Sequence, residues 1–222
     1  MTSLFPALAI ALGLAVAGGV LVSVIIMDRR RLEAMRQAAM MAGFQFEDRL
    51  DQNALETTVG VLPLFRRGHS RKATSVMRTT RHGKPVVLMD YQFTTGGGKN
   101  SHTHRLTVAV FPDSVAGVPD FEIGPENFLH RIGQVFGYQD IDFDEDEEFS
   151  KTFLLRGQDE AAIRAAFGPS IRMLFSGLPG WSAEVRAGSL AAYRSDKRCK
   201  PEEISAFLES ASRIQSTLGR DS

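Results

Sequence analysis

The sequence predicts an α+β protein with an N-terminal transmembrane helix, a largely antiparallel sheet domain with packed helices, and a C-terminal amphipathic helix. Two observations carry this prediction. Residues 4–27 contain no charged side chain, and a helix of that length, rising about 1.5 Å per residue, spans a bilayer core of about 30 Å. Further along, runs of β-branched and aromatic residues come in series before helices in series, which favours an antiparallel sheet.

The chain of 222 residues divides into three predicted parts. Residues 1–27 form the transmembrane anchor, residues 28–43 a juxtamembrane helical stalk that stops at Gly43, and residues 44–222 a soluble α+β domain. Hydrophobic residues make up 43% and charged residues 23% of the chain. This is ordinary globular usage, so disordered and collagen-like classes are excluded.

The first half of the domain has the texture of a sheet. Val87, Met89, Tyr91 and Phe93 alternate with other residues, so they share one face of a strand, and 96–102 supplies the hairpin loop that leads to the next strand. The expected elements are a short helix at 51–57 and strands at 59–65, 73–79, 85–95 and 103–111.

The second half is predicted to contain further helices and two shorter strand pairs. Apolar residues at helical spacing predict a final helix from Pro201, because Ile204, Phe207, Leu208 and Ala211 share one face. The other expected elements are a helix at 125–137, strands at 140–143 and 152–156, a helix at 159–167, and a hairpin of 181–187 with 190–194.

Charge around the apolar run predicts a topology. Arg29, Arg30 and Arg31 follow the run directly, and the positive-inside rule keeps such a flank in the cytoplasm. The prediction is a single-pass membrane protein with its N-terminus outside and its soluble domain cytoplasmic. The alternative is a signal peptide cut near Ala17 or Gly18.

Small residues recur every fourth position within the apolar run, which predicts a packing face for a second helix. This face consists of Ala7, Ala11, Ala15, Gly19 and Ser23. Self-association or a protein partner would dock there. A chance stripe is an equal alternative, because small residues are common in such helices.

Positive and negative charges are separated along the chain. Residues 28–111 carry 14 basic and 7 acidic groups, and residues 112–222 carry 12 and 19. One basic cluster consists of Arg66, Arg67, Arg71, Lys72, Arg78, Arg81 and Lys84. Near an anionic bilayer each such residue contributes about 1 kcal/mol, so the lipid bilayer is a predicted partner. No nucleic acid is expected, because aromatic residues are not interleaved with these charges, and a solvated strand face is the other interpretation.

An acidic run predicts a surface for a basic partner or a cation. It consists of Asp140, Asp142, Asp144, Asp146 and Glu148. It is not an EF-hand, because the sixth position holds Glu145 where glycine is required and the twelfth holds Lys151 where a glutamate belongs.

Other motifs fail on their spacing. Gly96 to Lys99 lacks the earlier glycine and the following Ser or Thr of a phosphate-binding loop. His102 and His104 could share one strand face and bind zinc, but no third ligand is identifiable. Cys199 lies between two cations, which lowers a thiol pKa, yet no partner histidine is recognisable, so it is interpreted as a surface thiol. No catalytic, cofactor-binding or metal-binding residue and no cofactor is therefore predicted.

Three segments of the sequence together carry a resemblance. They are the run from Phe65 to Ala73, the run Met89-Asp90-Tyr91-Gln92-Phe93, and the stretch from Asp140 through Phe149 to Gly157. They resemble a family of uncharacterised bacterial single-pass membrane proteins with a cytosolic domain of unknown function. The resemblance implies a bacterial inner-membrane setting, and it transfers no activity and no residue roles to this chain.

The functional prediction is a membrane-tethered, non-catalytic interaction or accessory protein at the cytoplasmic face of the inner membrane. One alternative is a carboxylate- and metal-dependent hydrolase in which Asp140, Asp142 and Asp144 converge with a histidine. The other is an anionic-lipid-binding module that uses the basic cluster.

Overall fold

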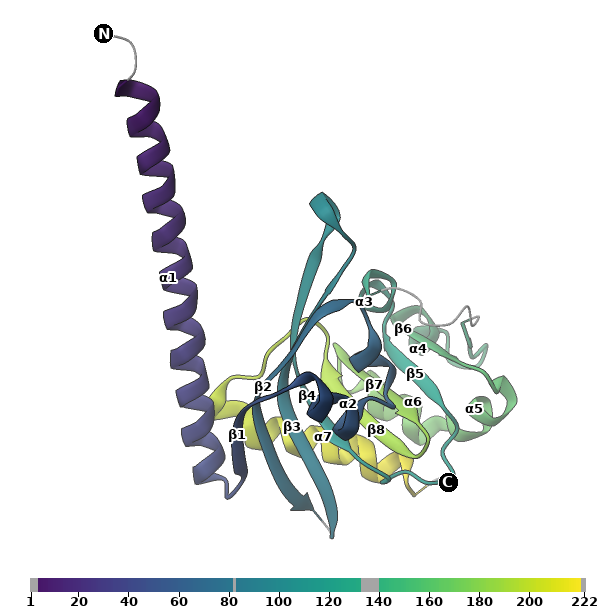
Figure 1. The fold of residues 1–222 in the computed structure, drawn as a ribbon. Coiled ribbons are helices and arrows are strands. Elements are labelled where there is room, and N and C mark those ends of the chain that lie inside the picture. The colour runs from purple at the N-terminus through teal and green to yellow at the C-terminus, as the bar shows by residue number, and fades with distance from the viewer. Residues whose placement is uncertain (1–3, 82, 133–139, 221–222) are drawn as a thin grey trace.

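An antiparallel sheet of eight strands organises the chain (Figure 1). The computed structural model describes residues 4–81, 83–132 and 140–220, with the side chains of 4–17, 20 and 21 outside the description. The strand order is β1-β2-β3-β4-β8-β7-β5-β6, and every neighbouring pair is antiparallel. The strands are β1 Gln45–Leu50, β2 His69–Arg81, β3 Lys84–Thr95, β4 His102–Phe111, β5 Phe121–Pro125, β6 Phe153–Gly157, β7 Trp181–Arg186 and β8 Ser189–Arg194.

Helices lie on both faces of this sheet (Figure 1). The α-helices are α1 Leu4–Met41, α2 Gln52–Val59, α3 Glu126–Arg131, α4 Glu147–Thr152, α5 Glu160–Ala166, α6 Pro169–Ser176 and α7 Ile204–Leu218. Short 3-10 turns are η1 Pro63–Arg66, η2 Gly98–Asn100 and η3 Pro201–Glu203. One apolar core contains residues of α1, α5, α6 and α7, and a second contains residues of α2, η1 and α3. The sheet therefore separates two cores.

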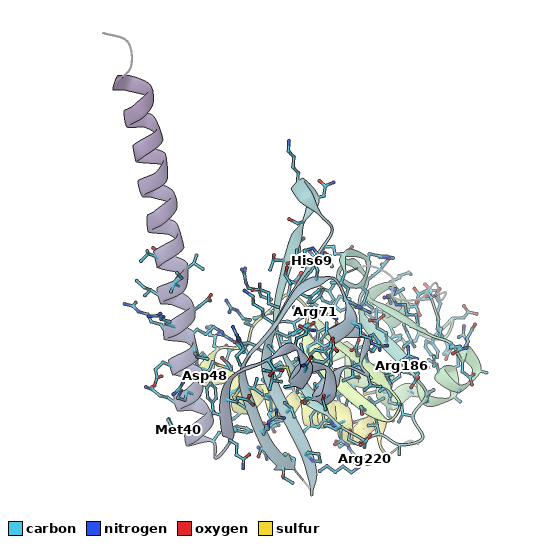
Figure 2. All side chains as sticks on the ribbon, in the orientation of Figure 1. Met40, Asp48, His69, Arg71, Arg186 and Arg220 are labelled. Carbon is cyan, nitrogen blue, oxygen red and sulfur yellow. The ribbon has the colours of Figure 1, made fainter. Side chains whose placement is uncertain are left out.

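The structure of α1 corrects the predicted transmembrane anchor at residues 1–27. Within the part of the chain that the structure describes, no helix combines the length and the apolar character needed to cross a bilayer. The predicted fold class is therefore wrong where it begins with a transmembrane helix. The later part of α1 carries charges from Asp28 to Arg36, and Met35 and Ala39 are fully buried in the first core. Figure 2 shows Asp48 beside this end of α1, where Arg36 donates to its carboxylate at 2.6 Å.

Several predicted elements are confirmed. The alternating residues of 85–95 and 103–111 form β3 and β4, which pair from Val87 with Val110 to Thr95 with His102. The last predicted hairpin forms β7 and β8. In α7 the whole predicted stripe is buried, because its apolar face covers the sheet and Phe207 stacks on Trp181 with ring centroids 4.9 Å apart.

Two predicted strands are wrong. Residues 59–65 end α2 and form η1, because Pro63 favours the first turn of a helix and the side chain of Asp51 caps α2 at the backbone N–H of Ala54. Residues 140–143 form a loop beside β6, where the N–H of Ile141 donates to the carbonyl of Leu155 at 2.8 Å and the N–H of Leu155 donates to the side chain of Asp140 at 3.1 Å. The end of the predicted helix at 125–137 lies outside the described residues.

The second core contains a buried ion-pair network. Glu122 of β5 accepts hydrogen bonds from Arg67, which follows η1, and from Nε of Arg156 in β6 at 2.8 Å. All three side chains are at most 9% exposed. Glu184 of the neighbouring strand β7 is fully buried and accepts from the backbone N–H of Leu64 at 2.8 Å. These contacts connect η1 to the β5-β6-β7 end of the sheet.

Candidate anion-binding pocket between helix α1 and the sheet

A pocket of about 350 Å³ lies where α1 passes over strands β2, β3 and β4. This volume is within the range of small-ligand sites. The residues that line it are Ile25, Asp28, Arg29, Arg31, Leu32, Lys72, Thr74, Ser75, Asp90, Tyr91, Gln92, Arg105 and Arg198. Five of these side chains are basic and two are acidic, so the pocket carries net positive charge.

One buried carboxylate fixes the position of α1 over the sheet. Asp90 of β3 is 4% exposed and accepts two bonds from Arg31, at 2.8 Å from Nε and 2.9 Å from Nη2. The hydroxyl of Thr107 on β4 donates to the same carboxylate at 2.6 Å. Nη2 of Arg31 also donates to the carbonyl of Cys199 at 2.7 Å. Because Asp90 has partners at both oxygens, it holds the pocket together and is not free to act as a base.

An irregularity in β2 lies beside the pocket. The pairing of β2 with β3 shifts between Thr74 and Met77, and Ser75 has a positive φ of 51°. A bulge of this kind bends a strand and re-aims its side chains. Thr74 and Ser75 both line the pocket, so the bulge contributes polar atoms to its wall.

Four further cations surround the pocket. Arg29 and Lys72 are exposed, and Nε of Arg105 donates to Gln92 at 2.9 Å. Arg198 has one weak ion pair, 3.9 Å from Asp28. Burial lowers the pKa of Arg198, and the nearby charge of Arg31 lowers it further. A bound anion would offset this repulsion, so phosphate, sulfate or carboxylate is the ligand chemistry that the pocket fits.

Apolar side chains adjoin the pocket on α1. Val22, Val24, Ile25, Ile26 and Met27 are between 44% and 69% exposed, and Ile25 also lines the pocket. Exposed apolar residues that adjoin one another usually indicate a surface that binds apolar material. The pocket and this turn of α1 together present a cationic surface next to an apolar one.

The predicted basic cluster is dispersed in the structure. Only Lys72 lines the pocket. Arg67 is buried against Glu122, and Arg78 pairs with Glu47 at 3.7 Å. Lys84 donates to the carbonyl of Ser114 at 2.9 Å. The remaining members are Arg71, which donates to the carbonyl of Phe65, and the exposed Arg66 and Arg81.

Two members of the predicted acidic run make structural contacts, and the other three are exposed. Asp140 accepts from the backbone N–H of Leu155 at 3.1 Å. Asp146 caps α4 and pairs with Arg172 at 3.0 Å. Asp142, Asp144 and Glu148 are exposed. Among the described residues these carboxylates form no cluster with a histidine that could hold a metal ion, so the arrangement proposed for a hydrolase is not assembled there.

The predicted packing face of α1 is described only in part. Gly19 and Ser23 are exposed, and the Ser23 hydroxyl donates to the carbonyl of Gly19 at 2.8 Å. The side chains of Ala7, Ala11 and Ala15 lie outside the described part of the chain. A second helix on this face stays a prediction.

Sequence reasoning missed most of the pocket. Arg31, Asp90, Arg105 and Arg198 come from four separate segments, and no local spacing connects them. One pattern could have drawn attention to the site. Asp90 is the single acidic residue between 57 and 112 and lies inside an apolar strand, and a carboxylate in that position requires a buried partner.

Comparisons with known proteins give the fold alone. No family model matches the chain, and no curated protein matches it. One solved structure, the mycobacterial trehalose monomycolate transport factor A, TtfA, is similar with a TM-score of 0.64 and 10% sequence identity. The match covers 86% of this chain and 95% of TtfA. The resemblance to an uncharacterised single-pass family therefore stays a prediction.

The thiol of Cys199 is expected to react slowly. It is 5% exposed, not on the surface as predicted, and burial raises its pKa to about 12. Because the thiolate is the reactive form, we expect labelling at pH 7.5 to be about a hundredfold slower in the folded chain than in urea. Equal rates for the folded and unfolded chains would contradict this burial.

Proposed function

We propose that this chain is a non-catalytic accessory protein that binds an anionic lipid. In this proposal the pocket between α1 and the sheet takes the charged head group, and the apolar turn of α1 contacts the acyl part. The place of action is the predicted one, the inner face of a bacterial membrane. The likeness to TtfA, a protein named as a transport factor, supports an accessory role in transport.

The observation that carries the proposal is the charge of the pocket. Beyond the Arg31–Asp90 pair, four cations face one acidic residue, Asp28, around a cavity of head-group size. Binding is favoured over catalysis, because the buried carboxylate of this pocket is already engaged by Arg31 and Thr107. Ile25 places an exposed apolar side chain at the same pocket, so an amphiphilic anion fits better than a free ion.

Vesicle flotation tests the proposal with the full chain. Vesicles of neutral lipid are compared with vesicles that contain anionic phosphatidylglycerol. The double variant Lys72→Glu/Arg105→Glu removes two exposed cations and leaves the Arg31–Asp90 pair intact. At about 1 kcal/mol per cation, we expect its affinity for anionic vesicles to fall about thirtyfold or more, with no change on neutral vesicles.

The matched control is Arg213→Glu/Arg220→Glu, which makes the same change in net charge at exposed positions in and after α7. This control should bind nearly as the unchanged chain does. An equal loss in both double variants would mean that only net charge matters. Wild-type binding that is the same on neutral and anionic vesicles would refute the pocket as an anion site.

A further inference from the structure

Two histidines at the start of β4 meet an aspartate from a distant part of the chain. His102 and His104 lie two residues apart on one strand, and their ring centroids are 4.5 Å apart. Asp196 follows β8, and its Oδ1 lies 2.7 Å from Nδ1 of His104. One ligand atom from each of the three residues lies within 4.8 Å of the others, and this is the sole such group among the described residues.

We propose that His102, His104 and Asp196 together bind one divalent transition-metal ion, with Zn²⁺ as the expected occupant. Imidazole nitrogen and carboxylate oxygen are the ligands that zinc takes besides thiolate. Three protein ligands leave a fourth tetrahedral position for water or for a donor from a partner. The site is separate from the anion pocket, because Arg105 and Gln92 line that pocket whereas His104 packs in the second core.

The sheet brings Asp196 to the two histidines. Strand β8 pairs with β4 from Leu190 with Phe111 to Tyr193 with Val108. Beyond the strand, the N–H of Thr107 donates to the carbonyl of Lys197 at 3.2 Å, so the chain continues beside β4. Asp196 then adopts a positive φ of 50°, which aspartate tolerates better than most residues. With this backbone conformation, the carboxylate of Asp196 points towards His104.

The surroundings of His104 are those of a metal-ligating histidine. Its Nε2 lies 3.0 Å from the hydroxyl of Thr95, which can accept the Nε2 proton. A metal ion would replace the proton that Nδ1 shares with the Asp196 carboxylate at 2.7 Å, and a proton on Nε2 donated to Thr95 would then leave the Nδ1 lone pair for the metal. Phe93 stacks on the imidazole at 4.8 Å, and Phe128 meets its edge at 6.1 Å. These rings hold the imidazole in place and keep water from its inner side.

Exposure gives the ion a route to the site. His102 is exposed and the side chain of Asp196 is 25% exposed, while His104 is fully buried. The outer oxygen Oδ2 of Asp196 pairs with Arg131 at 3.2 Å, which leaves Oδ1 directed at His104. Figure 1 shows the tip of the β3-β4 hairpin projecting beyond the other strands, and His102 begins β4 just after this tip.

Metal titration of the full chain tests the proposal. The protein is first treated with a chelator and then titrated with Co²⁺, whose visible absorption reports tetrahedral coordination, and with Zn²⁺ by calorimetry. We expect one equivalent to bind with a dissociation constant of about 1 μM or lower. The variants His102→Ala and Asp196→Asn should weaken binding at least about tenfold, because each loses one of three ligands.

The control His69→Ala removes another exposed histidine and should bind the metal as the unchanged chain does. His102 is exposed, so its replacement leaves the fold intact, and circular dichroism of each variant checks this. The proposal is overturned if the unchanged chain shows no saturable binding. It is equally overturned if His102→Ala and Asp196→Asn bind as tightly as His69→Ala.

Discussion

Replacement of Glu122 by leucine is expected to lower the free energy of unfolding by about 3–5 kcal/mol. Glu122 is the shared carboxylate of Arg67 and Arg156, whose side chains are 2% and 3% exposed. Without it, two guanidinium groups stay buried with no carboxylate between them. Burial already lowers the pKa of both arginines, which shows that their surroundings disfavour the charged form. Urea unfolding followed by circular dichroism measures the loss.

The matched control for this prediction is Glu126→Leu. Glu126 lies in α3, four positions further along, and its side chain is 55% exposed in an ion pair with His130. Its replacement should change the free energy of unfolding by no more than about 0.5 kcal/mol. If Glu122→Leu cost less than about 1 kcal/mol, the two arginines would have found water or other partners, and the network would not hold η1 to the sheet.

Local patterns explain which elements could be predicted. Strands β3 and β4 follow from alternation, and α7 follows from an apolar stripe, because each pattern reflects contacts of its own element with one core. The interpretation of 59–65 as a strand failed because an apolar run can also bury itself in a helix end and a 3-10 turn. Pro63 was the residue that indicated a 3-10 turn in place of a strand.

The two candidate sites depend on contacts between distant segments. In the pocket, Arg31 meets Asp90 across 59 positions and Cys199 across 168. In the proposed metal site, the spacing of His102 and His104 was visible, whereas Asp196 is 92 positions from His104. The order of strands in the sheet decides which distant residues meet, and this order could not be predicted from the sequence alone. Contacts between distant segments also join the two oppositely charged halves of the chain. Arg67 from the basic half forms an ion pair with Glu122 from the acidic half.

As the pH rises from 4.5 to 7, the free energy of unfolding is expected to decrease because Glu184 loses its proton. Burial raises the pKa of Glu184 from 4.5 to about 7, against the opposing effects of the Arg67 charge and the Leu64 N–H. In this window the folded state holds a proton that the unfolded state has released, so stability decreases with rising pH. A difference of about 2.5 pH units corresponds to about 3 kcal/mol, present in full below pH 4.5 and lost above pH 7.

The variant Glu184→Gln isolates this effect, because an amide resembles the protonated carboxyl and does not titrate. Unfolding free energies of both chains are measured from pH 4.5 to pH 8. We expect near equality at pH 4.5 and a variant more stable by up to about 3 kcal/mol at pH 8. Oxygen Oε2 of Glu184 has no hydrogen-bond partner within the described residues, so no donor there stabilises the ionised carboxylate. Parallel pH profiles would instead mean that Arg67 keeps Glu184 ionised, and Arg67 would then serve two carboxylates at once.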